Sequence, residues 1–596
     1  MKLIWDDLRQ YSRQFWQHWL ALIALFVGID VLNQLVFIPL LRWGTTFILQ
    51  AGGIPFVSYQ NLLILITQHQ FVVLALLGEL IILLLLIYWQ FALLLSGLRL
   101  ILHDQATWRL MLQQSWQAVR QIRWGSLPLM LGYFILVIPF VDLVFRTPLL
   151  SKVQIPEFIV DFMTRSGALL TTLIVFYTII TVLGVRLILT LPLMIYEGQP
   201  TKTAVTNSWR LTGHLRWWSY LKRLIVLGLL ATLFLGAFYA VIYGVQWVMD
   251  LFPGKFAFVT AVINLTLIQA VSELLTIWAG IVALQIIIAL LPVKGIVSAP
   301  PTKEPYRGVG LVFAILMLMI AGVAIFNNIY YLRGAQVNQP ITISHRGVAE
   351  ENGVQNTIPA LQKTHRLHPT YVEMDVHETK DHQFVVLHDE NLKELTGVDK
   401  TPHQLTLKQL TKLTAKENGH QAKIASFDQY LAAAERLHQK LLVEVKTTPQ
   451  DSKGMLRRFN QQYGQRLIRD HDQAQSLDYW AVTTLKKLNP QLKVLYIQPY
   501  NFSYPHSIAD GYSMEYSTLN FEFIRQSHYQ DHPVYSWTVN EPGVMKQMMY
   551  NHVDGIITDN LGELNRTIGS YTGAMSYANR LLNFILVVPT GGGLEP

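Results

Sequence analysis

Long apolar stretches fill most of the first 332 residues and limit the folds that this chain can adopt. A membrane-spanning helix needs about 20 predominantly apolar residues, and seven stretches reach or approach that length. With 51% hydrophobic and 14% charged residues, the chain of 596 residues is too apolar for a soluble protein. We therefore predict a multi-span α-helical membrane domain with about seven spans. They cover residues 19–41, 71–98, 127–145, 168–197, 221–250, 258–291 and 309–332, and 46–66 is a weaker candidate for an eighth span or a re-entrant segment.

The Lys and Arg residues of this domain indicate its orientation. With a cytoplasmic N-terminus, sixteen of them lie in cytoplasmic segments and five in outer segments, which is the usual bias of multi-pass cell-membrane proteins. Because the number of spans is odd, everything after residue 332 is then extracellular. The first span is too long for a signal peptide and no cleavage site follows it, so we expect it to remain as an anchor. The net charge of +8 comes mostly from short loops, and we predict no nucleic-acid partner.

Two ten-residue segments of this domain resemble each other, SWQAVRQIRW at 115–124 and SWRLTGHLRW at 208–217. We interpret each as an amphipathic helix at the inner membrane surface, with Trp and Arg at the level of the lipid headgroups. The alternative is that they share only the composition favoured at that interface. Polar residues inside the spans, such as Asn264 and Gln269, either form a lipid or ion site or pair between helices.

Short strand patterns alternate with helical stretches between residues 337 and 565. This alternation over roughly 230 residues is typical of a parallel α/β sheet, and a (β/α)8 TIM-type barrel matches it in size. We therefore predict a polytopic membrane domain at 1–336 with a linker at 292–308, a barrel at 337–565, and an apolar tail at 566–596. The tail is expected to pack on the barrel or lie on the membrane. The chain has no cysteine, which excludes disulfides and thiolate zinc sites.

Charged side chains gather at the ends of four predicted strands, ITISHRG (341–347), YVEMDVHET (371–379), FVVLHDE (384–390) and LLVEVK (441–446). Residues two apart share one face of a strand, so Glu373, Asp375 and His377 point the same way. Buried carboxylates are costly unless a metal ion or a partner charge satisfies them. For His377 we favour a supporting or surface position. The remaining set predicts a metal-assisted phosphate site, with a salt-bridge network as the alternative: His345, Arg346, Glu373, Asp375, His388, Glu444 and Lys446.

The order of these motifs carries a family resemblance. HRG at 345–347, Asn356-Thr357, EMDV at 373–376, LHDENLKELTG at 387–397, EVK at 444–446, WTVN at 537–540 and DGIITD at 554–559 resemble the motifs of the glycerophosphodiester phosphodiesterase family. The membrane part is similar in layout to the multi-span domain that some bacterial members carry ahead of the barrel. The resemblance implies a phosphoric diester hydrolase that releases glycerol 3-phosphate and an alcohol.

The resemblance also implies a role for each charged residue. By motif, the metal ligands fall on Glu373, Asp375 and Glu444, the catalytic histidines on His345 and His388, and the residues that hold the phosphate oxygens on Arg346 and Lys446. The metal would be one divalent cation, Ca²⁺ or Mg²⁺. One histidine would act as base and the other as acid, in an order that the sequence leaves open.

Two further residues are predicted to line the barrel mouth. Trp537 would stack on the glycerol, with plain barrel packing as the alternative, and Asn540 would hydrogen-bond a hydroxyl. One departure from the family pattern occurs after HRG. Where the family usually has Pro-Glu-Asn-Thr, this chain has Val354-Gln355-Asn356-Thr357, and the missing acid is expected in a supporting position, so that metal affinity is the property it affects.

An enzyme fixed at the membrane surface favours a substrate that is found there. We expect a lipid headgroup, a lysophospholipid or a glycerol-phosphate polymer such as lipoteichoic acid, with membrane lipid as the surrounding partner. The alternative is a non-catalytic module that binds or transports a lipid or polymer. A third option is phospholipase-type cleavage that ends at a cyclic phosphate. The sequence leaves the oligomeric state open.

Overall fold

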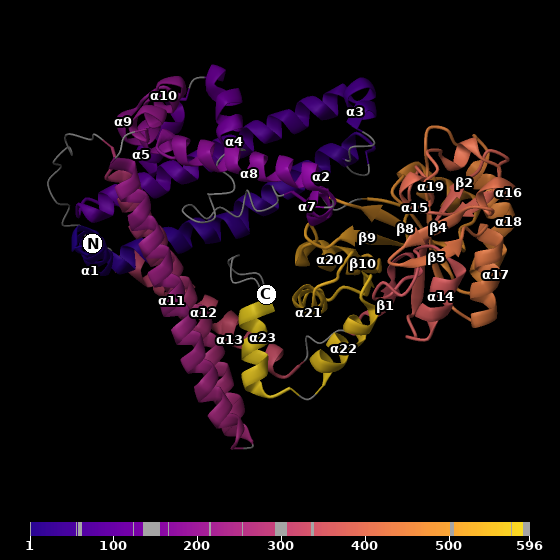
Figure 1. Ribbon diagram of the computed structural model, residues 1–596. Helices are drawn as coiled ribbons and strands as arrows, with labels where there is room; N and C mark the ends of the chain where they lie inside the picture. Colours follow the sequence, from indigo (N-terminus) through magenta and orange to yellow (C-terminus); the bar gives the residue numbers. More distant parts are fainter. Residues whose placement is uncertain are drawn as a thin grey trace.

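The computed structural model describes residues 2–54, 57, 62–122, 124–134, 155–164, 166–213, 216–252, 254–291, 307–334, 339–500, 506–573 and 575–587. Figure 1 shows two parts side by side, a domain of long helices and a barrel of strands surrounded by shorter helices. The main helices of the first part are α1 Lys2–Leu32, α2 Ile38–Ala51, α3 Leu62–Gln68, α4 Gln70–Leu102, α8 Gly167–Leu187, α9 Thr190–Glu197, α11 Arg216–Asp250, α12 Lys255–Ile288 and α13 Arg307–Leu332.

Six helical stretches of the described residues are long and apolar enough to cross a membrane: Ile4–Ala51, Gln70–Leu102, Gly167–Glu197, Tyr220–Asp250, Lys255–Ile288 and Gly310–Leu332. They correspond to six of the seven predicted spans. The first is longer than expected, because α1 and α2 continue into each other through a π-helical turn at Asn33–Phe37. The predicted span 127–145 and the linker 292–308 lie partly outside the described residues, and the candidate 46–66 is divided between α2 and α3.

The surfaces of these helices suit a membrane. Large apolar side chains face outward, for example Phe71, Leu233 and Leu318 with 89%, 69% and 73% of their surface exposed. Such faces match the hydrocarbon of a bilayer, whereas polar groups in that environment need partners. The polar side chains do pair between helices. Asn264 Nδ2 of α12 donates to Gln246 Oε1 of α11 at 2.9 Å, which supports helix pairing as the interpretation of this residue.

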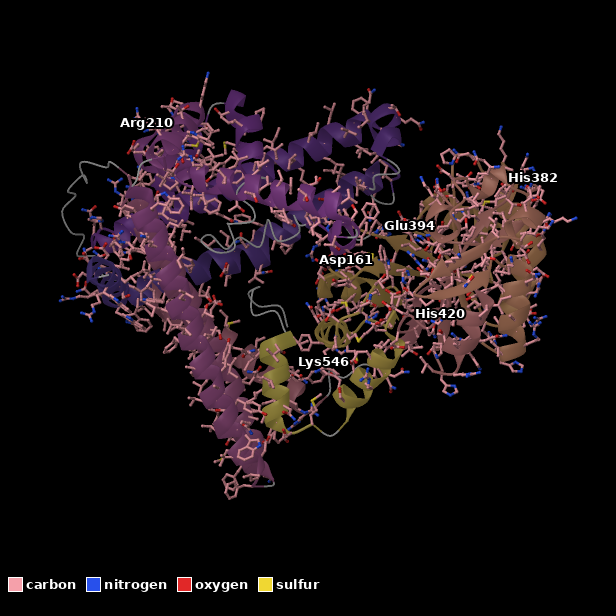
Figure 2. All side chains as sticks on the ribbon, in the orientation of Figure 1. Asp161, Arg210, His382, Glu394, His420 and Lys546 are labelled. Atoms are coloured by element: carbon pink, nitrogen blue, oxygen red, sulfur yellow. The ribbon has the colours of Figure 1, made fainter. Side chains whose placement is uncertain are left out.

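The two repeat-like segments begin in short amphipathic helices, α5 Trp108–Arg120 and α10 Thr201–Leu211. Both helices end before the predicted segments do. Helix α5 packs on α4 and α10 packs on α9, and all four meet at the end of the helical domain that is remote from the barrel (Figure 1). Arg210 of α10 projects from this remote end (Figure 2). The arrangement agrees with helices at the membrane surface on the side opposite the barrel.

The second part is a closed barrel of eight parallel strands, which confirms the predicted (β/α)8 fold. Strand order is β1-β11-β10-β9-β8-β7-β6-β2, and pairing of β1 with β2 closes the ring. The barrel strands are β1 Ile341–Ser344, β2 Tyr371–Glu378, β6 Leu441–Val445, β7 Gln473–Ser476, β8 Lys493–Gln498, β9 Gly511–Glu515, β10 Val534–Trp537 and β11 Gly555–Thr558. The helices between them are α14 Ile358–His365, α17 Phe427–Leu437, α18 Met455–Arg469, α19 Tyr479–Leu488, α20 Phe521–His528 and α21 Pro542–Tyr550, and α22 Leu561–Thr572 follows the last strand.

One long excursion leaves the barrel between β2 and β6. Its first strand, β3 Phe384–Val386, pairs antiparallel with β2, so the predicted strand at 384–390 lies outside the ring. The helical turns α15 Lys393–Thr396 and α16 Leu407–Leu410 follow. A separate hairpin, β4 Thr414–Glu417 and β5 His420–Lys423, completes the excursion.

The alternation of side chains along β2 separates the core from the site. Val372, Met374 and Val376 face outward and pack with the surrounding helices in the main core. Glu373 and Asp375 therefore face the barrel interior, where successive side chains alternate with a period of two. Below them, Tyr371 belongs to a small apolar cluster that fills the barrel interior, with Ile343, Leu442, Leu495, Tyr535 and Ile557.

The C-terminal tail returns to the membrane domain. Helix α23 Tyr577–Val587 packs on α11 and α12, and its Leu581 and Phe584 join an apolar cluster with Tyr331 of α13. Asp250 Oδ2 at the end of α11 accepts a hydrogen bond from the backbone N–H of Ala578 at 2.8 Å. The tail therefore fastens the barrel to the ends of three membrane helices. Helix α22 runs across the predicted barrel boundary at residue 565.

Candidate active site

Three buried carboxylates meet at the carboxyl ends of two neighbouring strands. Glu373 and Asp375 come from β2, and Glu444 of β6 lies beside Asp375 in the parallel register. One oxygen of each lies within 4.8 Å of the other two, and all three residues are buried. The structure therefore brings together the acids that the sequence singles out, at the barrel face where this fold places active sites.

Lys446 lies between two of these carboxylates and balances part of their charge. Its Nζ is 3.0 Å from Asp375 Oδ1 and 2.5 Å from Glu444 Oε1. Although burial opposes the charge, Lys446 and other cationic neighbours hold the pKa of Asp375 far below its usual range. Glu373 is different, because burial and the charges of Asp375 and Glu444 raise its pKa well above the usual value.

The donor set fits a divalent cation. Three neighbouring carboxylates repel one another, and burial together with the charges of Asp375 and Glu444 raises the pKa of Glu373. Carboxylate oxygens are the ligands that Ca²⁺ and Mg²⁺ prefer. A cation held by Glu373, Asp375 and Glu444 would stabilise all three as anions.

A second group of potential ligand atoms, from Glu378, His403 and Asp451, also lies within 4.8 Å. Its central carboxylate is already satisfied. Glu378 accepts hydrogen bonds from the N–H and Oγ–H of Ser452, both at 2.7 Å, and forms an ion pair with Arg458. We therefore regard this group as a structural network and assign it no metal.

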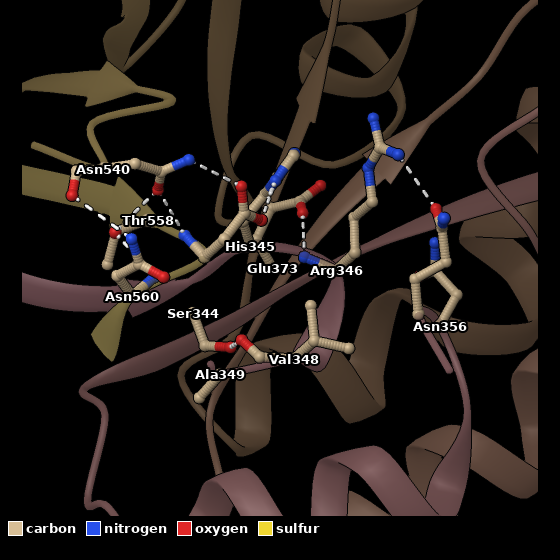
Figure 3. A network of polar contacts seen from close by, with 12 residues as sticks. Ser344, His345, Arg346, Val348, Ala349, Asn356, Glu373, Asn540, Thr558 and Asn560 are labelled. Atoms are coloured by element: carbon tan, nitrogen blue, oxygen red, sulfur yellow. Dashed lines mark hydrogen bonds and ion pairs between the residues drawn. The ribbon is translucent and has the colours of Figure 1, made fainter. Parts of the chain in front are cut away.

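His345 is held by an aspartate that the sequence analysis does not single out. Its Nδ1 is 2.8 Å from Oδ1 of Asp559, the last residue of DGIITD. Asn540 Nδ2 donates to Asp559 Oδ2 at 2.9 Å, and the Asp559 N–H donates back to Asn540 Oδ1 at 2.9 Å. Although burial opposes it, the His345 and Asn540 contacts lower the pKa of Asp559 to about 2. Figure 3 shows His345 between Asn540 and Glu373.

The contacts of Asn540 differ from those expected. Its Oδ1 also accepts from Thr558 Oγ1 at 3.0 Å, so both ends of the amide are engaged in holding the loop after β11. A hydrogen bond to a substrate hydroxyl would have to compete with these contacts. The aspartate that ends the strand motif DGIITD at 554–559 was the signal in the sequence that could have identified Asp559.

His388 lies at the start of the excursion and has its own carboxylate. Its Nδ1 is 2.7 Å from Asp389 Oδ1. Burial lowers the pKa of His388, and the charge of Asp375 and the hydrogen bond with Asp389 partly offset that effect. His377 supports the loop from below, since its Nε2 donates to the His388 carbonyl at 3.0 Å and burial lowers its pKa to about 4. This agrees with a supporting position for His377.

Arg346 reaches the site with both its backbone and its side chain. It adopts a left-handed conformation with φ of 51°. Its backbone N–H donates to Glu373 Oε2 at 2.8 Å, and its Nη1 donates to Gln355 Oε1 at 2.9 Å. The neighbouring Asn356 donates from Nδ2 to Asp375 Oδ2 at 2.8 Å. Figure 3 shows the guanidinium of Arg346 extending away from Glu373.

The mouth of the barrel touches the membrane domain. Helix α7 Glu157–Thr164 carries Phe158, whose ring centroid lies 5.9 Å from that of Trp537 at the end of β10. The backbone N–H of Glu157 donates to Ser517 Oγ at 3.0 Å. Asp161 of α7 lies between the helical domain and the barrel (Figure 2). Trp537 therefore faces both the barrel interior and a helix of the membrane domain.

Comparison with known protein families matches both parts of the chain. Residues 8–326 match the family described as the membrane domain of glycerophosphoryl diester phosphodiesterase. Residues 345–563 match the glycerophosphoryl diester phosphodiesterase family.

Individual relatives match the barrel part. YhdW of Bacillus subtilis is 28% identical over 228 residues, which cover 36% of this chain and 93% of that protein. A glycerophosphodiester phosphodiesterase of Caldanaerobacter subterraneus is 25% identical over 228 residues, covering 37% of this chain and 93% of that protein. Among solved structures, a glycerophosphodiester phosphodiesterase from Parabacteroides distasonis is 24% identical, covers 40% of this chain and 100% of its own, and gives a TM-score of 0.36.

Proposed function

The chain belongs to the glycerophosphoryl diester phosphodiesterase family and carries that family's membrane domain, and from this premise we propose that it acts on a glycerol phosphodiester at the extracellular face of the cell membrane. It is a phosphoric diester hydrolase, and the proposed products are glycerol 3-phosphate and an alcohol. One observation carries the proposal. The buried carboxylates of Glu373, Asp375 and Glu444 converge at the same barrel end as two histidines, each paired with an aspartate.

We assign the metal and phosphate contacts as follows. Glu373, Asp375 and Glu444 would hold one divalent cation, Ca²⁺ or Mg²⁺, which would neutralise charge on the phosphodiester. Arg346 and Lys446 bind the phosphate oxygens. Lys446 Nζ lies 3.0 Å from Asp375 Oδ1, so this ammonium group stands at the barrel end where the phosphate is proposed to bind. The two cationic side chains thus bind the anionic phosphate group in the substrate, the transition state and the product.

His345 and His388 are the proposed proton carriers. The Nδ1 atoms of both rings are occupied by aspartates, which leaves Nε2 of each ring to exchange a proton with the substrate. One histidine takes the proton of the attacking hydroxyl and the other protonates the leaving alkoxide, each contributing about 10²- to 10⁴-fold. When the attacking group is the glycerol's own neighbouring hydroxyl, a cyclic phosphate forms first, and product analysis over time reveals it.

The barrel mouth supports a substrate presented at the membrane. Trp537 is the proposed stacking surface for the glycerol, and Phe158 of α7 lies against the same ring. Asn540 remains the proposed donor to a hydroxyl, in exchange for part of its contact with Asp559. Because the mouth adjoins the membrane domain, a lipid headgroup, a lysophospholipid or a glycerol-phosphate polymer such as lipoteichoic acid reaches it more readily than a freely diffusing diester does.

The proposed orientation rests on the positive-inside bias. The helix ends on the barrel side are poor in Lys and Arg, and the opposite end holds α10 with Lys202 and Arg210. The absence of cysteine makes the orientation testable. A single cysteine placed by Asp399→Cys is expected to react with a membrane-impermeant maleimide in intact cells, whereas Lys202→Cys reacts only after lysis. The reverse pattern would contradict an extracellular barrel.

The activity test measures glycerol 3-phosphate released from glycerophosphodiesters, lysophospholipid and glycerol-phosphate polymer with Ca²⁺, Mg²⁺ or a chelator. His345→Ala is expected to abolish metal-dependent release. His528→Ala is the matched control, because His528 forms a similar 2.8 Å contact with Asp554 at the opposite end of β11. If the native chain releases no product from any substrate, the non-catalytic binding or transport module becomes the better interpretation.

A further inference from the structure

The guanidinium of Arg346 is connected to the β4–β5 hairpin through one glutamine. Gln355 Oε1 accepts the bond from Arg346 Nη1 at 2.9 Å, and Gln355 Nε2 donates to Glu417 Oε1 at 2.6 Å. The other oxygen of Glu417 accepts from the backbone N–H of Gln355 at 2.7 Å. The hairpin is far from Arg346 in the sequence, yet its last β4 residue contacts the loop that holds this arginine.

The two hydrogen bonds that Glu417 accepts from Gln355 fix the direction in which the Gln355 amide points. An amide side chain has one accepting end and one donating end, and a half-turn about its last bond exchanges them. The reversed amide would present N–H groups to the guanidinium, which has only donors. Since both oxygens of Glu417 accept bonds from Gln355, the carboxylate keeps the carbonyl end toward Arg346.

The carboxylate of Glu417 is not neutralised by a cationic side chain among the residues that the structure describes. No Lys, Arg or His side chain forms an ion pair with it there, although most other partly buried acids of the barrel have one. Position 355 is also the place where the family pattern expects an acid and this chain has glutamine. In this chain the carboxylate that Arg346 reaches through its hydrogen bond to Gln355 is therefore that of Glu417, on the hairpin.

The geometry points to Glu417 as a positioning residue that orients Arg346 through Gln355, so that the β4–β5 hairpin belongs to the active site. The inference rests on the proposed function, in which Arg346 binds the phosphate. Among the described residues the guanidinium donates one hydrogen bond, from Nη1 to Gln355, and its Nε has no hydrogen-bond partner. The hydrogen bond that Arg346 donates to Gln355 thus sets the direction in which its remaining N–H groups face the phosphate.

A reciprocal exchange of the two side chains tests this inference. The native chain is compared with Gln355→Glu, Glu417→Gln and the double variant, measuring kcat and KM together with the affinity for glycerol 3-phosphate by calorimetry. Glu417→Gln can accept only one of the two bonds, so KM and the product dissociation constant are expected to rise about tenfold. Because Arg346 binds phosphate in both substrate and transition state, kcat is expected to change by less than about threefold.

The double variant is the decisive chain. Gln355→Glu alone places two carboxylates in contact and is expected to weaken product binding about tenfold or more. The double variant again has one carboxylate and one amide, with their positions exchanged, and is expected to bind product within about threefold of the native chain. Asp399→Asn removes an exposed carboxylate of the same excursion and serves as control, and melting temperatures verify that all chains fold.

Two outcomes would overturn the positioning role. Either both single variants match the native chain in KM and product affinity, or the double variant is no better than the weaker single variant. A native chain that binds glycerol 3-phosphate without releasing it from any diester refutes the proposed function, and the affinity comparison then still decides the role of Glu417. A native chain that neither reacts nor binds product refutes both.

Discussion

Replacing Asp559 by asparagine tests the most specific contact in the site. The change keeps the shape of the side chain and removes its charge. In the native chain one oxygen of Asp559 faces His345 Nδ1 at 2.8 Å and the other accepts from Asn540 Nδ2 at 2.9 Å. An asparagine has only one oxygen, so its NH₂ group must face either the donor of Asn540 or the ring nitrogen of His345.

Both arrangements disturb the histidine. With the NH₂ group toward His345, Nδ1 must become an acceptor, and the proton moves to Nε2, which is the atom proposed to act on the substrate. With the NH₂ group toward Asn540, two donors meet and the loop after β11 loses its anchor. A hydrogen bond to a charged group is worth about 1.5–3 kcal/mol. The Asp559 side chain is 40% exposed, so we take about 2 kcal/mol, which corresponds to roughly a 30-fold loss in kcat.

The assay is metal-dependent release of glycerol 3-phosphate at saturating substrate, with the native chain, Asp559→Asn and Asp554→Asn. Asp554 forms the analogous 2.8 Å contact with His528 remote from the site, and its variant is expected to keep the native kcat. The reasoning is refuted if Asp559→Asn keeps kcat within about twofold of native while its melting temperature is unchanged. An equal loss in both variants would show that the effect is structural.

Further predictions follow from the electrostatics of the barrel. Glu373→Gln removes one proposed ligand, so the divalent-cation concentration for half-maximal activity is expected to rise at least tenfold, a change that metal titration measures. Asp389→Asn removes a contact that raises the pKa of His388, so the limb of the pH profile of kcat/KM that belongs to this histidine is expected to move to lower pH. The limb that moves identifies His388 as the base or the acid. A profile in which neither limb moves contradicts a role for His388 in proton transfer. Burial raises the pKa of Asp472 to about 7, against about 3.9 in an unfolded chain. The folded chain therefore binds the proton of this carboxyl group more tightly than the unfolded chain does, and it loses stability as pH rises from about 4 to 7. Asp472→Asn keeps the acceptor for the N–H of Leu441 and is expected to raise the melting temperature at pH 8 but not at pH 4, and equal shifts at both values would count against burial as the cause.

Much of the fold could be predicted because its signals are local. A run of apolar residues long enough to cross a bilayer indicates a span regardless of what surrounds it, and six such helices are present in the described residues. The period of two along β2 identifies Glu373 and Asp375 as residues of one face before any partner strand is known. The alternation of strands and helices indicates a parallel barrel because the crossover connection requires a helix.

The contacts that orient the site were not predictable in the same way. The pairing of His345 with Asp559 depends on the closure of the barrel, which sets Ser344 of β1 beside Thr558 of β11. Glu417 reaches Gln355 because the hairpin folds back over the strand ends, and nothing in its local sequence indicates that position. Asn540 was predicted to meet substrate from its motif alone, and its actual partners depend on the loop after β11.

The sequence by itself determined the membrane domain, the barrel class and the residue types of the site, since hydropathy, strand period and motif order are properties of neighbouring residues. Only the tertiary structure decided which aspartate holds which histidine, that a hairpin carboxylate faces the Arg346 loop, and that α7 of the membrane domain packs against Trp537. These are contacts between residues up to several hundred positions apart. Their geometry depends on ring closure and domain packing, where a displacement of about 1 Å makes or breaks a hydrogen bond.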